Sequence, residues 1–173
     1  YNRSSTFARA LRTRPWYDVV TRAGFLLGRT DPAVDPKGVL AVDALEGVAL
    51  SYGVPALAPL ASATNDVFPE TTLVGRLQAG QLDAGFFYRV EAVSASLATI
   101  PLTGTRLGAS YTVAIVRGAP HLAAARAFVR FLFSATGRRL IAASGITPVA
   151  APVAVRATPT TTTTVAATTT TAP

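Results

Sequence analysis

Cysteine is absent from this 173-residue chain, and histidine occurs only once. Without cysteine, the chain can form neither a disulfide bond nor a thiolate metal site. His121 lies in the first turn of a helix-patterned stretch, where exposure is expected, and no GxSxG motif supplies a nucleophile. Paired zinc ligands, a Walker-type loop and a dinucleotide fingerprint are missing too. The sequence therefore predicts a protein that is not an enzyme and holds no metal or cofactor of its own.

The lengths of the apolar runs and the distribution of charge argue against a membrane span and a nucleic-acid partner. The longest apolar run is far too short to span a bilayer, whereas 50% hydrophobic residues are enough for a real core. The formal net charge of +7 comes almost wholly from arginines scattered along the chain. Because no basic stripe with interleaved aromatic residues accompanies them, we expect no nucleic-acid partner. A general attraction for small anions fits this charge better.

The two ends of the sequence differ from the rest. Tyr1 is not a methionine and no signal peptide precedes it, so we expect a fragment or processed product whose true start lies upstream. Residues 157–173, ATPTTTTTVAATTTTAP, lack charge and periodicity and are predicted to be disordered. Such a tract fits the stalk of an exported protein and equally well a low-complexity terminus.

Helix and strand signals alternate between these ends. Apolar runs at 24–28, 82–88 and 110–116 predict buried strands. This alternation indicates an α/β sheet with helices on its faces. The predicted helices span 4–11 (with a cap at Ser4 or Ser5), 15–23, 38–52 (apolar face Val42, Leu45, Ala49 and Tyr52), 70–80, 120–132 (apolar face Ala125, Phe128, Val129 and Leu132) and 136–144, and 54–69 are predicted to form a loop.

The segment GRTDPAVDPKG (28–38) holds two Asp-Pro steps just ahead of the helix predicted to end at Gly53. Asp31-Pro32 is typical of a type I turn. Asp35-Pro36 is typical of a helix start, with Asp as the N-cap and Pro at the first helical position. Together they are expected to pass the chain from a strand to a helix, the place where open α/β sheets bind ligands.

A helix start of this kind offers a site for an anion. We expect the backbone N–H groups of Lys37, Gly38 and Val39 to point out of the helix end, where Gly38 lets a ligand approach closely. Tyr88, at the end of a predicted strand, is positioned to donate its hydroxyl to the same anion. A plain capped helix and an ordinary strand-end tyrosine remain open as alternatives.

The order of these motifs resembles that of the molybdate/tungstate-binding proteins of ABC importers. The resemblance implies a two-lobed α/β clamshell of the type II periplasmic-binding-protein fold, of which this chain supplies mainly lobe two and the C-terminal return to lobe one. The segments that carry it are the pattern from Tyr1 and Ser5 through Trp16-Tyr17 to GRTDPAVDPKG (1–38), LQAGQLDAGFFYRVEA (77–92) and RGAPHLAAARAFVRFLFSATGRRLIAASGITPV (117–149). The implied parts are the end of lobe one and hinge (1–13), lobe two (14–100), the return segment and closing helices (101–156) and the tail (157–173).

The resemblance also implies roles for single residues. Asp35 falls on the cleft position that starts the lobe-two helix, and Tyr88 falls on the tyrosine whose hydroxyl donates to the oxyanion; Ser5 matches a serine to which we assign no role. Members with extra metal coordination carry a glutamate where this chain has Phe87. Because a carboxylate repels a dianion, we favour a capping role for Asp35 and leave direct metal coordination open.

The predicted ligand-binding set is Asp35, Lys37, Gly38 and Tyr88. The function that the resemblance implies is an extracytoplasmic, monomeric binding protein that delivers molybdate or tungstate to an ABC permease and its ATPase, membrane-anchored or secreted. Two alternatives stay open: the ligand-sensing clamshell of a transcription regulator, and a truncated remnant that binds nothing tightly.

Overall fold

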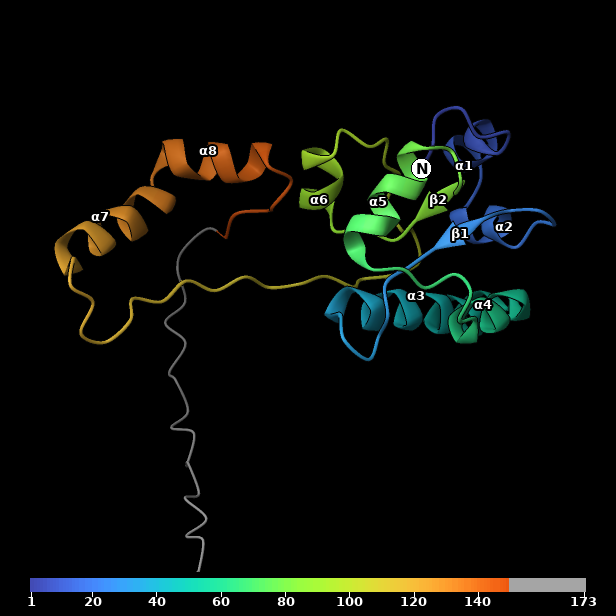
Figure 1. The fold of residues 1–173 in the computed structure, drawn as a ribbon, viewed down its shortest axis with the longest axis horizontal. Helices are drawn as coiled ribbons and strands as arrows, with labels where there is room; N and C mark the ends of the chain where they lie inside the picture. The colour runs from blue at the N-terminus through green and yellow to red at the C-terminus, as the bar shows by residue number, and fades with distance from the viewer. Residues whose placement is uncertain (150–173) are drawn as a thin grey trace, which may run out of the picture.

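The structure is a computed structural model of the chain and describes residues 1–149. Figure 1 shows a main body that runs from the N-terminus to α6, followed by an extended segment and a separate pair of helices, α7 and α8. The tail predicted to be disordered, 157–173, lies outside the described residues, as does the end of the predicted return segment.

The six predicted helices all occur, with ends shifted by a few residues. The predicted cap of the first helix at Ser4 or Ser5 is wrong, because this helix begins after Phe7 and has no side-chain cap. The stretch 54–69, predicted to be a loop, instead holds a 3-10 helix and a short α-helix, because a proline at the start of each is compatible with a helical first turn. The elements are α1 (Ala8–Thr13), α2 (Trp16–Val20), β1 (Leu27–Gly28), α3 (Pro36–Tyr52), η1 (Pro55–Leu57), α4 (Ala58–Ser62), α5 (Glu70–Gln78), β2 (Ala84–Gly85), α6 (Arg89–Ser94), α7 (Leu122–Leu132) and α8 (Ala135–Ala143).

The sheet in the described residues is much smaller than predicted. It consists of β1 and β2, two residues each, paired in parallel with Leu27 opposite Ala84 and Gly28 opposite Gly85. The predicted strand at 110–116 is wrong: this segment is extended, and Tyr111 and Val116 are 59% and 76% exposed. Backbone needs a neighbouring strand to form a ladder, and no strand of the described residues pairs with it. Helices beside a short parallel sheet remain compatible with the α/β class.

Asp83 fastens the N-terminal segment to both strands. Its carboxylate accepts hydrogen bonds from the backbone N–H of Leu26 (2.8 Å) and from the hydroxyl of Ser5, and its carbonyl accepts from the N–H of Asn2 (2.9 Å). The Ser5 oxygen accepts in turn from the N–H of Phe7, just ahead of α1. The serine that the sequence singled out therefore holds the start of the chain against the sheet.

The core of the main body lies against α3, which ends as predicted at Gly53 in the left-handed conformation (φ 65°). The face of α3 that packs inward is shifted from the predicted one. Leu45 is fully buried and Val42 and Ala49 pack against the core as predicted, but Tyr52 is 52% exposed. Ala41, Ala44 and Val48 are buried in addition. The cluster of buried residues comprises Trp16, Val20, Leu27, Ala41, Ala44, Leu45, Val48, Leu57, Ala61 and Phe86.

A second, smaller cluster lies between α5 and the strands. Leu73, Leu77 and Leu82 are buried there, with Phe68 and Phe87 packed against them. The two clusters place α3 and α5 on different sides of β1 and β2, and α6 follows directly after β2.

The helix pair α7–α8 has an apolar face that nothing in the described residues buries. No residue of α7 is buried, and Phe128, from the predicted face, is 59% exposed. Ser134 caps α8 through the N–H of Gly137 (3.1 Å), and the chain after α8 reaches the backbone of Arg89, where Gly145 (φ 95°) lies. Every helix in residues 1–149 is too short or too polar to cross a bilayer.

Gly38 lies where the turn before α3 packs onto the first turn of the helix. A β-carbon at this position would lie 2.6 Å from backbone atoms of Thr30, Asp31 and Pro32. The sequence suggested that the missing side chain leaves room for a ligand; instead, the chain's own backbone fills that space. Glycine is thus required here by the close approach of the turn.

We expect Gly38→Ala to lower the free energy of unfolding by about 1–3 kcal/mol, since backbone must move to admit the methyl group. Gly47→Ala is the matched control in the same helix, because a β-carbon on this exposed residue would meet nothing within 4 Å. That variant should stabilise the protein by about 0.5–1 kcal/mol. Urea denaturation followed by circular dichroism measures both, and equal effects would contradict the packing argument.

Candidate functional site

The two Asp-Pro steps adopt the conformations predicted for them. The carbonyl of Asp31 accepts from the N–H groups of Val34 (3.2 Å) and Asp35 (2.9 Å), and its carboxylate accepts from Ala33 (2.9 Å), so Asp31-Pro32 forms a tight turn. Asp35 is the N-cap of α3, and its Oδ1 accepts from the N–H of Lys37 at 2.8 Å. The capping role favoured for Asp35 is confirmed.

The prediction of free N–H groups at the start of α3 is wrong. The N–H of Lys37 donates to the Asp35 carboxylate, and those of Gly38 (2.9 Å) and Val39 (3.4 Å) donate to the Asp35 carbonyl. Pro36 has no N–H to offer. The first turn is satisfied by its own cap, because Asp35 presents both a side-chain and a main-chain acceptor to it.

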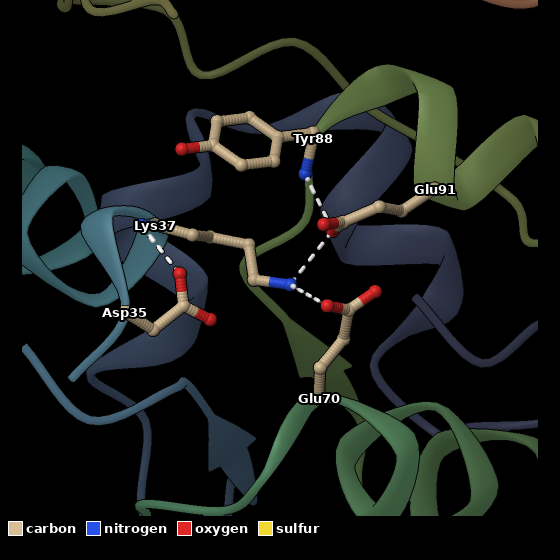
Figure 2. Close-up of polar contacts among 5 residues, drawn as sticks. All are labelled: Asp35, Lys37, Glu70, Tyr88 and Glu91. Atoms are coloured by element: carbon tan, nitrogen blue, oxygen red, sulfur yellow. Dashed lines mark hydrogen bonds and ion pairs between the residues drawn. The ribbon is translucent and has the colours of Figure 1, made fainter.

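Lys37 is buried instead of exposed to a ligand. The residue is 3% exposed, and its Nζ lies 2.8 Å from Glu91 Oε2 and 3.8 Å from Glu70 Oε2. Figure 2 shows the ammonium between the two carboxylates, which come from α6 and α5. The rings of Phe87 and Tyr88 lie 5.6 and 5.9 Å from Nζ. The charge of Lys37 is therefore compensated within the protein.

Tyr88 begins a helix and does not end a strand. It is the N-cap of α6, and its backbone N–H donates to Glu91 Oε2 at 3.0 Å. Figure 2 shows the phenol turned toward the start of α3, away from the Lys37 ammonium. Partial burial raises the pKa of the Tyr88 hydroxyl, and Tyr111, Asp35 and Glu91 raise it further. The hydroxyl therefore stays a neutral donor at physiological pH.

Asp35 and Tyr88, predicted from segments far apart in the sequence, line one open groove of the protein surface. The groove lies where the turn before α3, the start of α6 and the extended segment after it meet. Of the predicted set, Lys37 and Gly38 do not line it: the first is paired behind the groove and the second lies under the turn. The groove is lined by Pro32, Ala33, Val34, Asp35, Pro36, Val39, Leu40, Tyr88, Gly108 and Ala109.

Sequence reasoning missed Glu91 and Glu70. Glu91 follows Tyr88 by three residues, the spacing of a side chain that turns back to the N-cap of its helix, and this spacing was the available signal. A lone lysine at a helix start that becomes buried also requires a carboxylate, but the sequence does not say which one. Among residues 1–149, no three metal-ligating side chains gather in one place.

Arg29 of the same segment supports the fold. It is 4% exposed, and its guanidinium donates to the carbonyls of Ala61 (2.9 Å), Ala63 (2.7 Å) and Thr30 (3.3 Å). The first two lie at the C-terminal end of α4, where a cation is favoured by the exposed carbonyls. Arg29 thus ties the turn before α3 to the end of α4.

Comparison with known proteins shows which family this chain resembles. A putative ABC transporter molybdenum-binding protein of Haloferax volcanii is 38% identical over 85 residues, 49% of this chain and 28% of that protein. Molybdate/tungstate-binding proteins of Pyrococcus abyssi and Thermococcus kodakarensis are 23% and 22% identical over 192 residues, which cover 81% of this chain and 56% and 54% of theirs. The chain thus spans a little more than half the length of the Pyrococcus and Thermococcus proteins and less than a third of the Haloferax protein. No solved structure matches it significantly.

The model of one protein family, described as bacterial extracellular solute-binding protein, matches residues 7–147. The match takes in every helix and both strands described above. The family is one of transport proteins and not a class of enzymes. This chain belongs to the bacterial extracellular solute-binding protein family.

Proposed function

We propose that this chain is part of an extracytoplasmic binding protein that delivers molybdate or tungstate to the permease and ATPase of an ABC transporter. The observation that carries the proposal is the groove in which Tyr88 and the Asp35-capped start of α3 come together. The names of the relatives from Haloferax, Pyrococcus and Thermococcus support the ligand class. The family favours a transport role over the sensing domain of a transcription regulator.

The groove recognises an anion through hydrogen-bond donors. Tyr88 supplies a neutral hydroxyl, whereas the Asp35 carboxylate is occupied with the N–H of Lys37 and repels a dianion that comes close. A hydrogen bond to a charged group contributes about 1.5–3 kcal/mol, but nanomolar affinity needs about 12 kcal/mol. Further donors must therefore face the groove in the assembled binding protein. In the proposed clamshell, with residues 14–100 as lobe two and one protomer as the unit, lobe one would supply them.

The ligand class is tested by calorimetric titration of the product of the complete reading frame with molybdate, tungstate, sulfate and phosphate. Because the Asp35 carboxylate caps α3 and is not expected to face the ligand, the donors that remain favour anions that carry no proton. We therefore expect molybdate or tungstate to bind and phosphate, which keeps a proton near neutral pH, to bind worst. Tightest binding of phosphate would refute the proposed ligand class, and absence of binding for all four would refute the proposed function.

Tyr88→Phe tests the hydroxyl by itself, because the ring and its packing remain. We expect molybdate affinity to fall by about 1.5–3 kcal/mol, with the melting temperature of the unliganded protein nearly unchanged. Since the pKa of Tyr88 is raised, the difference between the two proteins should stay constant from about pH 7 to 9. Unchanged affinity in the Phe variant would exclude Tyr88 from the ligand contacts.

We expect Asp35 to contribute to the stability of the protein and not to its affinity for molybdate. Asp35→Ala removes the cap of α3 and should cost about 0.5–2 kcal/mol of unfolding free energy. Asp35→Asn keeps an oxygen that accepts from the N–H of Lys37, so it should retain both stability and molybdate affinity. Thermal denaturation and calorimetry of the two variants separate the roles. Loss of binding in Asp35→Asn at an unchanged melting temperature would instead make the carboxylate a ligand of the metal.

A further inference from the structure

One carboxylate oxygen joins the two helix starts that flank the groove. Glu91 Oε2 accepts from the Lys37 ammonium at 2.8 Å and from the backbone N–H of Tyr88 at 3.0 Å. The backbone N–H of Lys37 donates in turn to Asp35 Oδ1 at 2.8 Å. Figure 2 shows this continuous chain of contacts from Asp35 through Lys37 and Glu91 to Tyr88. It connects residues that lie 54 positions apart in the sequence, Lys37 and Glu91.

The connection lies behind the groove and not in it. Neither Lys37 nor Glu91 lines the groove that Tyr88 and Asp35 share; Glu91 lines a separate hollow with Glu70, between α5 and α6. The side chain of Lys37 is 4% exposed and that of Glu91 17%. Because water reaches this pair poorly, its attraction is screened less than that of a surface pair. Glu70 is a weaker partner, at 3.8 Å and with a half-exposed side chain.

We propose that Lys37 and Glu91 are positioning residues of the oxyanion site: they hold the Tyr88 hydroxyl in register with the start of α3 without contacting the anion. The inference rests on the proposed function. It replaces the expectation that Lys37 binds the ligand itself, because the ammonium already has its counter-charge in Glu91.

Lys37→Met and Tyr88→Phe, alone and combined, test the coupling. The protein from the complete reading frame is titrated with molybdate, and its melting temperature is recorded without ligand. If Lys37 acts by placing the Tyr88 hydroxyl, each single change should raise the Kd for molybdate about tenfold. The Kd of the double variant should then lie within about twofold of that of the weaker-binding single variant. Losses that multiply in the double variant would overturn the proposal, because a direct contact or a general loss of stability predicts that result.

Glu91→Gln keeps the proposal testable if Lys37→Met does not fold. If Glu91 acted only through its negative charge, it would repel the dianion, and Glu91→Gln would bind molybdate more tightly. A positioning role instead predicts that Glu91→Gln binds molybdate at least about fivefold more weakly. Glu70→Gln is the matched control, because it removes the other carboxylate beside the same ammonium. Its affinity should stay within about twofold of the unmodified protein.

The outcomes separate the two proposals. Tighter binding in Glu91→Gln, or an equal loss in Glu70→Gln, would overturn the positioning role and leave the proposed function standing. An unmodified protein that binds none of the oxyanions would overturn both.

Discussion

A buried ammonium group requires a counter-charge, and the junction between α3 and α6 is built around that requirement. Lys37 is 3% exposed, and the nearest charge is Glu91 at 2.8 Å. Removing one partner of a buried pair leaves an uncompensated charge, which costs about 3–5 kcal/mol. The first turn of α6 must therefore lie beside the first turn of α3. The groove lined by Tyr88 exists at this junction because the pair brings the two helix starts together.

The density of special residues in GRTDPAVDPKG is explained largely by folding. Arg29 donates to the carbonyls at the end of α4, and Asp31 closes the turn through its carbonyl and carboxylate. Asp35 caps α3, and Gly38 lets the turn pack against it. Lys37 then pairs with α6. Residues that form a turn, a helix cap or an ion pair can thus give a segment the appearance of a ligand-binding motif. Only part of this segment lines the groove.

Most of what the sequence predicted well is local, and its largest omissions concern how separate segments meet. The Asp35 cap and the left-handed end of α3 at Gly53 depend on residues within one helical turn, so their signals can be recognised from spacing alone. The pairing of Lys37 with Glu91 depends on how two segments meet in space. The sequence shows only a lone lysine at a helix start and a glutamate three residues after Tyr88, and neither signal identifies the other as its partner. The run 110–116 predicted a strand because its apolar residues indicate a segment that favours burial. Such a run does not indicate whether a neighbouring strand is present to pair with it.

The cap geometry also decides what kind of force can hold an anion in this groove. The Asp35 carboxylate offsets much of the positive potential of the α3 N-terminus, and Glu91 neutralises Lys37, so neither of these groups leaves a net positive charge beside Tyr88. The net charge of +7 lies on arginines spread over the chain and provides attraction at long range, which salt screens. Affinity at contact must then come from aimed hydroxyl and N–H donors. Such donors work only when they are held in position. Under the proposed function, the buried Lys37–Glu91 pair, although remote from the anion, therefore sets how well Tyr88 can bind it.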